Sequence, residues 1–112
     1  MYNEILTLEK RFFQHKYISD RTWLEKILHG DFLECGKSGK LFDKKYTVES
    51  LLKCAKNRDI EINDYTCRQI DKNSWLIHYI TVSENNRYFR TSVWVLKENL
   101  QLLYHQATIL KE

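Results

Sequence analysis

The chain has 112 residues, of which 43% are hydrophobic and 29% charged, as is usual for one globular domain spanning residues 1–112. The formal net charge of +3 is too small to indicate nucleic-acid binding, which needs a strongly basic surface. No apolar run approaches the roughly 20 residues that cross a membrane. The N-terminus also lacks a signal-peptide pattern, so we expect a cytoplasmic protein without a membrane partner.

The three cysteines, Cys35, Cys54 and Cys67, lie far apart in the sequence and form no C-x-x-C pair. Zinc sites in proteins usually require such pairs. We therefore expect reduced thiols that behave as small hydrophobic groups, and no metal site.

Residues 3–17 are predicted to form the first helix. Ile5, Leu8 and Phe12 recur at positions i, i+3 and i+7, which places them on one helix face. This face is expected to pack on the core.

A second helix is predicted to follow, with Ser-Asp at residues 19–20 as its N-cap. Its buried face would include Trp23 and Leu28. The His-Gly pair at residues 29–30 is typical of a helix C-terminus.

A short strand pair, residues 32–35 and 41–42, is predicted next around a glycine-containing turn at residues 36–40. Thr47 is predicted to cap a third helix, which would end near residues 57–59.

The second half of the chain predicts four long strands in succession. The first, residues 60–70, changes the parity of its apolar positions near Asn63 and Asp64, which indicates a β-bulge. Turn-forming residues separate the later strands. These later strands are predicted at residues 74–82, 87–96 and 100–110.

This order predicts an α+β fold with three N-terminal helices packed on a curved, mostly antiparallel sheet. Helices can cover only one face, but the strand at residues 74–82 is apolar at both parities. Because an apolar outer face should not be left in water, we expect a homodimer formed through that face.

Three segments in this order resemble the nuclear-transport-factor-2-like superfamily: GDFLECGKSGKLFDKK, RTSVW and HQAT. The similarity is closest to a small uncharacterised bacterial branch related to the SnoaL-like and ketosteroid-isomerase-like proteins. The family usually has tryptophan where Leu100 stands and glycine where Ala107 stands. The residues that match the family pattern are Asp31, Phe32, Glu34, Gly36, Ser38, Gly39, Arg90, Ser92, Trp94, His105, Gln106 and Thr108.

The resemblance implies a cone formed by a curved sheet around helices. Family members use this cone as an enzyme site, as a binding pocket or only as a core. Two functions therefore stay open: a module that binds a small apolar or amphipathic ligand or serves as a dimeric scaffold, and a cofactor-independent enzyme that performs proton-transfer or hydrolytic chemistry.

Four residues are candidates for a ligand pocket: Glu34, Arg90, Trp94 and His105. Arg90 and Trp94 share one strand face because they are four residues apart. An arginine in an apolar cavity needs an acidic partner, for which Glu34 is the candidate. His105 could transfer protons near neutral pH. The alternative is a Glu–Arg pair that closes the core without chemistry.

Other motifs are weaker. The string GKSGK lacks the glycine five positions earlier that a phosphate-binding loop needs, because Asp31 stands there. A metal site of His78 and His105 has no support from spacing. Residues 87–90 alternate basic and aromatic side chains, but a strand end beside a core explains them equally well. We expect no cofactor and no nucleic-acid partner.

Overall fold

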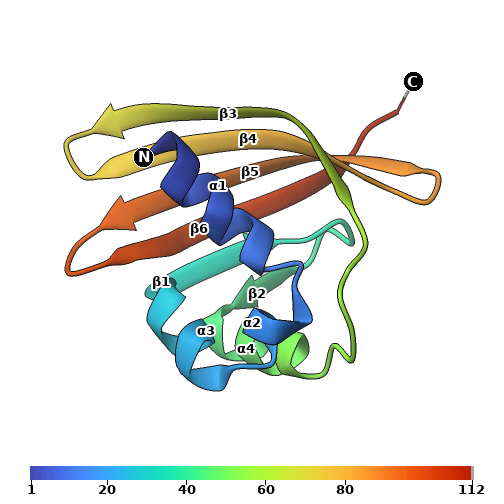
Figure 1. Ribbon diagram of the computed structural model, residues 1–112, viewed down its shortest axis with the longest axis horizontal. Helices are drawn as coiled ribbons and strands as arrows, with labels where there is room; N and C mark the ends of the chain where they lie inside the picture. Colours follow the sequence, from blue (N-terminus) through green and yellow to red (C-terminus); the bar gives the residue numbers. More distant parts are fainter. Residues whose placement is uncertain (112) are drawn as a thin grey trace.

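A computed structural model describes residues 1–111 of the protein. Within this range, four helices pack on one face of a six-stranded sheet, which confirms the predicted α+β class (Figure 1). The helices are α1 (Tyr2–Arg11), α2 (His15–Ile18), α3 (Arg21–Ile27) and α4 (Lys44–Leu52). The strands are β1 (Leu28–Cys35), β2 (Leu41–Asp43), β3 (Glu61–Asp71), β4 (Ser74–Ser83), β5 (Asn86–Leu96) and β6 (Leu100–Ile109).

The sheet has the strand order β2-β1-β6-β5-β4-β3. Strands β3 to β6 form the predicted antiparallel meander. The one parallel contact in this order joins β1 to β6 and aligns Glu34 with His105. Since β6 also pairs with β5, with Ser92 opposite His105, residues from three strands meet at this point of the inner face.

The β-bulge predicted in β3 is present. The register against β4 shifts between Asn63 and Thr66, and Asp64 has a left-handed backbone with φ of 55°. Aspartate tolerates this conformation better than most residues do. The bulge explains why the apolar positions change parity along this strand.

The core lies between the helices and the inner face of the sheet. In β4, Trp75, Ile77 and Tyr79 are buried, whereas the alternate residues Leu76 and Ile80 are half-buried. Figure 1 shows α1 crossing the meander and the other three helices grouped near β1 and β2. The helices contribute Ile5, Leu24, Ile27 and Val48 to the same cluster.

The N-terminal helix is shorter than the sequence predicts. The helix expected over residues 3–17 ends at Arg11, and a separate single turn, α2, begins at His15. Asn57, far along the chain, accepts a 2.7 Å hydrogen bond from the backbone N–H of His15. Phe12 and Phe13 lie in the turn at this break, and both of their side chains are buried.

The end of α3 also differs from the prediction. Asp20 is the N-cap, as expected, and its side chain accepts a 3.2 Å hydrogen bond from the N–H of Trp23. The helix, however, ends at Ile27, and strand β1 already begins at Leu28, so residues 29–30 belong to the strand and not to a helix terminus.

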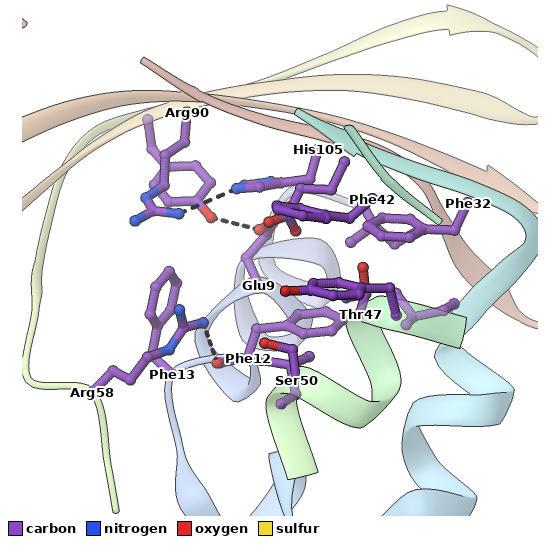
Figure 2. A pocket seen from close by; sticks show the side chains of 16 residues that line it. Glu9, Phe12, Phe13, Phe32, Phe42, Thr47, Ser50, Arg58, Arg90 and His105 are labelled. Carbon is purple, nitrogen blue, oxygen red and sulfur yellow. Dashed lines mark hydrogen bonds between the residues drawn. The ribbon is translucent and has the colours of Figure 1, made fainter. Parts of the chain in front are cut away.

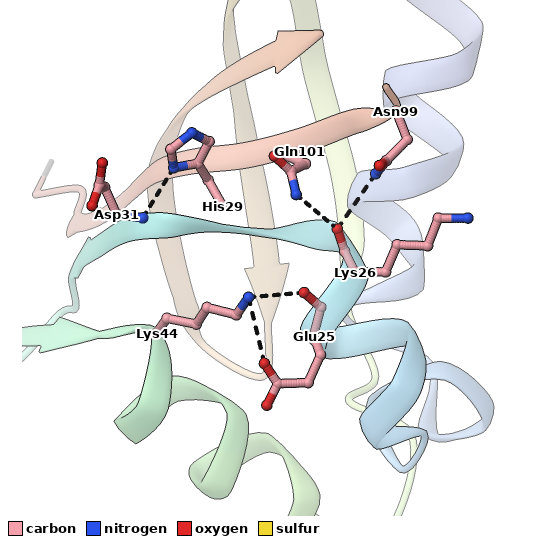
Figure 3. Close-up of polar contacts among 7 residues, drawn as sticks. All are labelled: Glu25, Lys26, His29, Asp31, Lys44, Asn99 and Gln101. Carbon is pink, nitrogen blue, oxygen red and sulfur yellow. Dashed lines mark hydrogen bonds and ion pairs between the residues drawn. The ribbon is translucent and has the colours of Figure 1, made fainter. Parts of the chain in front are cut away.

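Side chains from other elements satisfy the free carbonyl groups at this helix end (Figure 3). Lys44 donates a 2.8 Å hydrogen bond to the carbonyl of Glu25, and its amine also lies 3.4 Å from the Glu25 carboxylate. Gln101 and Asn99 donate hydrogen bonds of 3.2 Å and 3.4 Å to the carbonyl of Lys26. These contacts replace the glycine cap that the sequence suggested and connect α3 to α4 and β6.

Helix α4 begins before the predicted cap. Asp43, not Thr47, is the N-cap, and its side chain accepts a 2.9 Å hydrogen bond from the N–H of Tyr46. The helix ends at Leu52, several residues before the predicted end near residues 57–59. Thr47 consequently lies inside the helix, on the face that looks toward the sheet, where it is buried.

Candidate functional site

A pocket with a volume of about 310 Å³ lies between the inner face of the sheet, the end of α1 and helix α4 (Figure 2). Aromatic side chains, among them Phe12, Phe32 and Phe42, form much of its wall. Charged or buried polar side chains from six different parts of the chain reach the same space. They are Glu9, Glu34, Thr47, Arg58, Arg90 and His105.

Glu9 lies at the bottom of the pocket and is only 1% exposed. Its two carboxylate oxygens accept hydrogen bonds of 2.6 Å from the Tyr79 hydroxyl and 2.7 Å from the indole N–H of Trp94. Burial raises the pKa of this carboxyl, while hydrogen bonds from Ser92, Tyr79 and Trp94 and the charge of Arg90 oppose the shift. The hydrogen bonds that the Glu9 carboxylate accepts thus come from side chains of the sheet.

His105 is buried between two polar partners. Its Nε2 atom lies 3.3 Å from the Nη1 atom of Arg90, and its Nδ1 atom lies 2.8 Å from the Ser92 hydroxyl. Because an arginine can only donate, Nε2 accepts and the ring proton is on Nδ1, from which it is donated to Ser92. Ser92 can then donate its own proton to Glu9.

The resulting buried polar chain consists of Arg90, His105, Ser92 and Glu9. Burial, followed by the charges of Arg90 and Arg58, lowers the pKa of His105 to about 3, so the imidazole is neutral near pH 7. Both ring nitrogens are occupied within the protein. His105 therefore positions Arg90 and is not free to exchange protons with a ligand.

Two arginines lie beside the ring of Phe13 (Figure 2). The guanidinium carbon of Arg58 lies 4.5 Å from the ring centroid and that of Arg90 lies 5.2 Å from it. Arg58 follows α4 and is exposed as a whole residue, but its Nη2 atom donates a 2.6 Å hydrogen bond to the carbonyl of Phe12. The Nε atom of Arg90 donates a 2.8 Å hydrogen bond to Thr81. Each guanidinium is thus fixed by backbone or side-chain contacts.

Glu34 is half-buried on the pocket wall. Burial raises its pKa, and the positive charges of Arg58 and then Arg90 partly offset this shift. Among the described residues, neither arginine comes close enough to Glu34 to form a salt bridge. The expected Glu34–Arg90 ion pair is therefore absent, and the carboxylate stays available to the pocket.

Thr47 brings a hydroxyl group to the pocket that has no hydrogen-bond partner within residues 1–111. The residue is only 7% exposed. A buried hydroxyl without a partner is uncommon, because it loses the hydrogen bonds that water would offer.

Three of the four residues singled out in the sequence, Glu34, Arg90 and His105, reach the pocket. Trp94 lies on the same sheet face but does not line the pocket, because it is fully buried under α1 and bonded to Glu9. Sequence reasoning did not select Glu9, Thr47 or Arg58. For Glu9 a signal existed: it follows Ile5 by four residues and so shares the apolar face of its helix.

The described part of the chain has no group of three or more His, Cys, Asp or Glu side chains suited to a metal ion. It also has no helix that is long and apolar enough to cross a lipid bilayer. The pocket's polar groups with free hydrogen-bonding capacity include Glu34, Thr47 and the two arginines. They can bind a polar group of a small molecule against aromatic walls.

No protein-family sequence model matches the chain, and no curated protein sequence matches it. Solved structures do match. An NTF2-like protein from Cytophaga hutchinsonii has a TM-score of 0.79 at 21% identity, covering 96% of this chain and 97% of that one. An NTF2-like protein of unknown function from Prochlorococcus has a TM-score of 0.76 at 15% identity, covering 98% and 93%. A proposed ketosteroid isomerase from Parabacteroides distasonis has a TM-score of 0.78 at 11% identity, covering 99% and 89%.

Proposed function

Starting from the nuclear-transport-factor-2-like fold, we propose that the protein is a cytoplasmic module that binds a small amphipathic molecule in its pocket. The observation that carries this proposal is the unfilled space of about 310 Å³ bordered by the Thr47 hydroxyl, which has no hydrogen-bond partner within residues 1–111. A protein that used its cone only as a core would be expected to fill this space with side chains.

The composition of the wall supports the same function. Binding pockets are mostly apolar and carry a few polar groups that orient the ligand. Phe32 and Phe42 supply apolar surface, while Glu34 and Arg90 supply polar groups. The volume is at the lower end of the roughly 300–1,000 Å³ that ligand pockets span, which favours a small ligand.

A neutral fluorescent probe tests the proposal. We expect 1-aminoanthracene to bind with an increase in fluorescence and to protect the protein in thermal unfolding. Ser50 lines the pocket and is exposed, so Ser50→Trp should block the space without disrupting the core. Lys53→Trp is the matched control, because Lys53 is exposed nearby and is not part of the wall. Equal probe binding by both variants, or no binding by the unmodified protein, would contradict a ligand pocket.

A second function, proton transfer in the pocket, rests on Glu34. Its carboxyl has a raised pKa because of burial and faces free volume without a salt bridge in the described residues. Such a carboxylate can act as a general base. Incubation with 4-phenyl-2-butanone in D2O would detect this activity as deuterium incorporation beside the carbonyl. The activity should disappear in Glu34→Gln, and exchange at the rate of buffer alone would leave only the binding function.

We also infer that two copies of the chain associate through the outer face of the sheet. Leu76, Ile80 and Val93 are half-buried there, and Phe89 is 38% exposed. Their cross-strand pairs, Leu76 with Val93 and Ile80 with Phe89, form an apolar surface that the polar pair of His78 and Thr91 interrupts. A symmetric dimer would cover it in both copies.

Light scattering at tens of micromolar tests the association. We expect a mass twice the 13.6 kDa of one chain. Ile80→Glu should give the monomer mass, because it places a charge in the middle of the proposed interface. Lys53→Glu, on the opposite side of the molecule, should remain dimeric. A monomer mass for the unmodified protein would refute the interface.

A further inference from the structure

Arg58 and Arg90 place two positive charges beside the ring of Phe13 on the pocket wall. Within residues 1–111 neither Arg58 nor Arg90 forms a salt bridge, although Glu34 lies on the same pocket wall. The two positive charges also act on each other, since the charge of Arg90 lowers the pKa of Arg58 after the larger effect of burial. Two like charges held close together in a half-buried site are costly unless an anion joins them.

Both guanidinium groups keep unused donors that can face such an anion. An arginine carries five N–H donors. Arg90 uses its Nε atom for Thr81 and its Nη1 atom for His105, while Arg58 uses its Nη2 atom for Phe12. The Nη2 group of Arg90 and the Nη1 group of Arg58 have no hydrogen-bond partner among the described residues.

The fixed position of Arg90 favours binding. Its guanidinium is held at two atoms. The Nε atom donates a hydrogen bond to Thr81, and the Nη1 atom donates one to the neutral ring of His105. A donor that is already in place loses little side-chain freedom when a ligand binds. Both cations also contact the ring of Phe13, with guanidinium carbons 4.5 Å and 5.2 Å from the ring centroid.

We propose that Arg58 and Arg90 form a carboxylate-binding subsite, so that the ligand of this pocket is a small monocarboxylic acid with an apolar body. The proposal rests on the binding function proposed above and specifies its ligand class. The carboxylate lies between the two guanidinium groups, and the apolar body lies along Phe32 and Phe42. A planar carboxylate matches the parallel N–H groups of a guanidinium.

Glu34 favours the binding of a monoanion over the binding of a dianion such as phosphate. The pocket already contains two carboxyl groups, Glu34 and Glu9, and the positive charge of Arg90 acts on both of them. A monocarboxylate brings one further negative charge close to Glu34, whereas a phosphate dianion brings two and is repelled more strongly. Glu34 also competes weakly for the arginines, because it lies within their electrostatic range.

Calorimetric titration with 4-phenylbutyrate and the matched neutral 4-phenyl-1-butanol tests the subsite. We expect the acid to bind about tenfold more tightly or better, since charge-assisted hydrogen bonds are the strong ones. Arg58→Gln should remove this preference by weakening the binding of the acid much more than that of the alcohol. Lys56→Gln is the control, because it removes an equal charge from an exposed neighbour outside the pocket wall.

The affinity of Glu34→Gln for 4-phenylbutyrate distinguishes the proposed competition for the arginines from a purely structural role of Glu34. It should strengthen binding of 4-phenylbutyrate by several-fold, because it removes the competing carboxylate. Inorganic phosphate should displace 4-phenylbutyrate only weakly.

Equal affinity for the acid and the alcohol would overturn the subsite while leaving the pocket intact. Displacement by phosphate at concentrations as low as those of the acid would overturn the carboxylate assignment. If neither the acid, the alcohol nor 1-aminoanthracene binds, the pocket function itself fails together with the subsite.

Discussion

The Oε1 atom of Glu9 in α1 accepts a 2.6 Å hydrogen bond from the hydroxyl of Tyr79 in β4, although the two residues are 70 positions apart in the chain. The other carboxylate oxygen accepts from Trp94 in β5. Through one side chain, the N-terminal helix is therefore bonded to two central strands of the sheet. Both donors are buried, so neither can turn to water if the carboxylate is removed.

Glu9→Ala should consequently be strongly destabilising. It leaves the Trp94 N–H and the Tyr79 hydroxyl buried without an acceptor, and we expect a loss of about 3–5 kcal/mol in the free energy of unfolding. Glu9→Gln keeps an oxygen for Trp94 and an amide that can donate to Tyr79, so it should cost about 1 kcal/mol. Urea denaturation measures both, and similar losses for the two variants would show that these hydrogen bonds do not fix the helix.

His105 should make stability depend on pH. The folded protein holds the imidazole neutral, with a pKa of about 3, whereas the ordinary value is 6.5. Between these values the unfolded chain binds a proton that the folded protein does not, so stability falls as the pH is lowered from about 6.5. The expected contribution is up to about 1.4 kcal/mol per pH unit.

The matched variant His105→Gln separates this effect from other groups. The charged groups that act on or adjoin His105 are Arg90, Arg58 and Glu34, and Glu9 lies further along the buried polar chain. The raised pKa values of Glu9 and Glu34 act in the opposite direction, since they favour the folded state at low pH. Both carboxyls titrate in both proteins, so the difference between the two unfolding curves from pH 4 to 7 reports mainly on His105. Parallel curves would mean that the pKa of the imidazole is the same in the folded protein as in the unfolded chain.

The long strands could be predicted because their signals are local. Alternating apolar residues and turn-formers specify each hairpin of the meander without knowledge of the rest of the chain. The bulge at Asp64 could also be predicted, because it changes the parity of one strand. The parallel contact of β1 with β6 could not, since it joins Glu34 to His105 across most of the chain.

The residues of the pocket could be predicted only in part, because some of them are placed by contacts between distant segments of the chain. Arg90 and His105 stand out as polar residues within apolar strands. Arg58 lies in a loop whose position depends on contacts with Phe12 and Phe13, about 45 residues earlier, and no local pattern indicates it. The start of α4 was predicted four residues too late, because Asp43 and Thr47 are both good N-caps and the prediction selected Thr47.

Trp23 anchors α3 through aromatic contacts. It is half-buried, with ring centroids 5.0 Å from Phe12 and 5.4 Å from Tyr17. Trp23→Ala should lower the free energy of unfolding by about 2–3 kcal/mol, less than the 3–5 kcal/mol of a fully buried ring. Thr22→Ala, at an exposed position of the same helix, should stay within about 0.5 kcal/mol. A melting temperature unchanged by the tryptophan substitution would show that α3 contributes little through this face.

Thr47 should show opposite effects on stability and on binding. Its hydroxyl is buried and has no partner within the described residues, so the free protein bears the cost of removing it from water. Thr47→Val keeps the shape of the side chain and removes that group, and we expect the ligand-free protein to gain about 1 kcal/mol in the free energy of unfolding. A ligand that donates to or accepts from this hydroxyl should bind more weakly to the variant. Urea denaturation and calorimetric titration of the same two proteins measure both effects, and a loss of stability in Thr47→Val would show that the hydroxyl is already satisfied in the free protein.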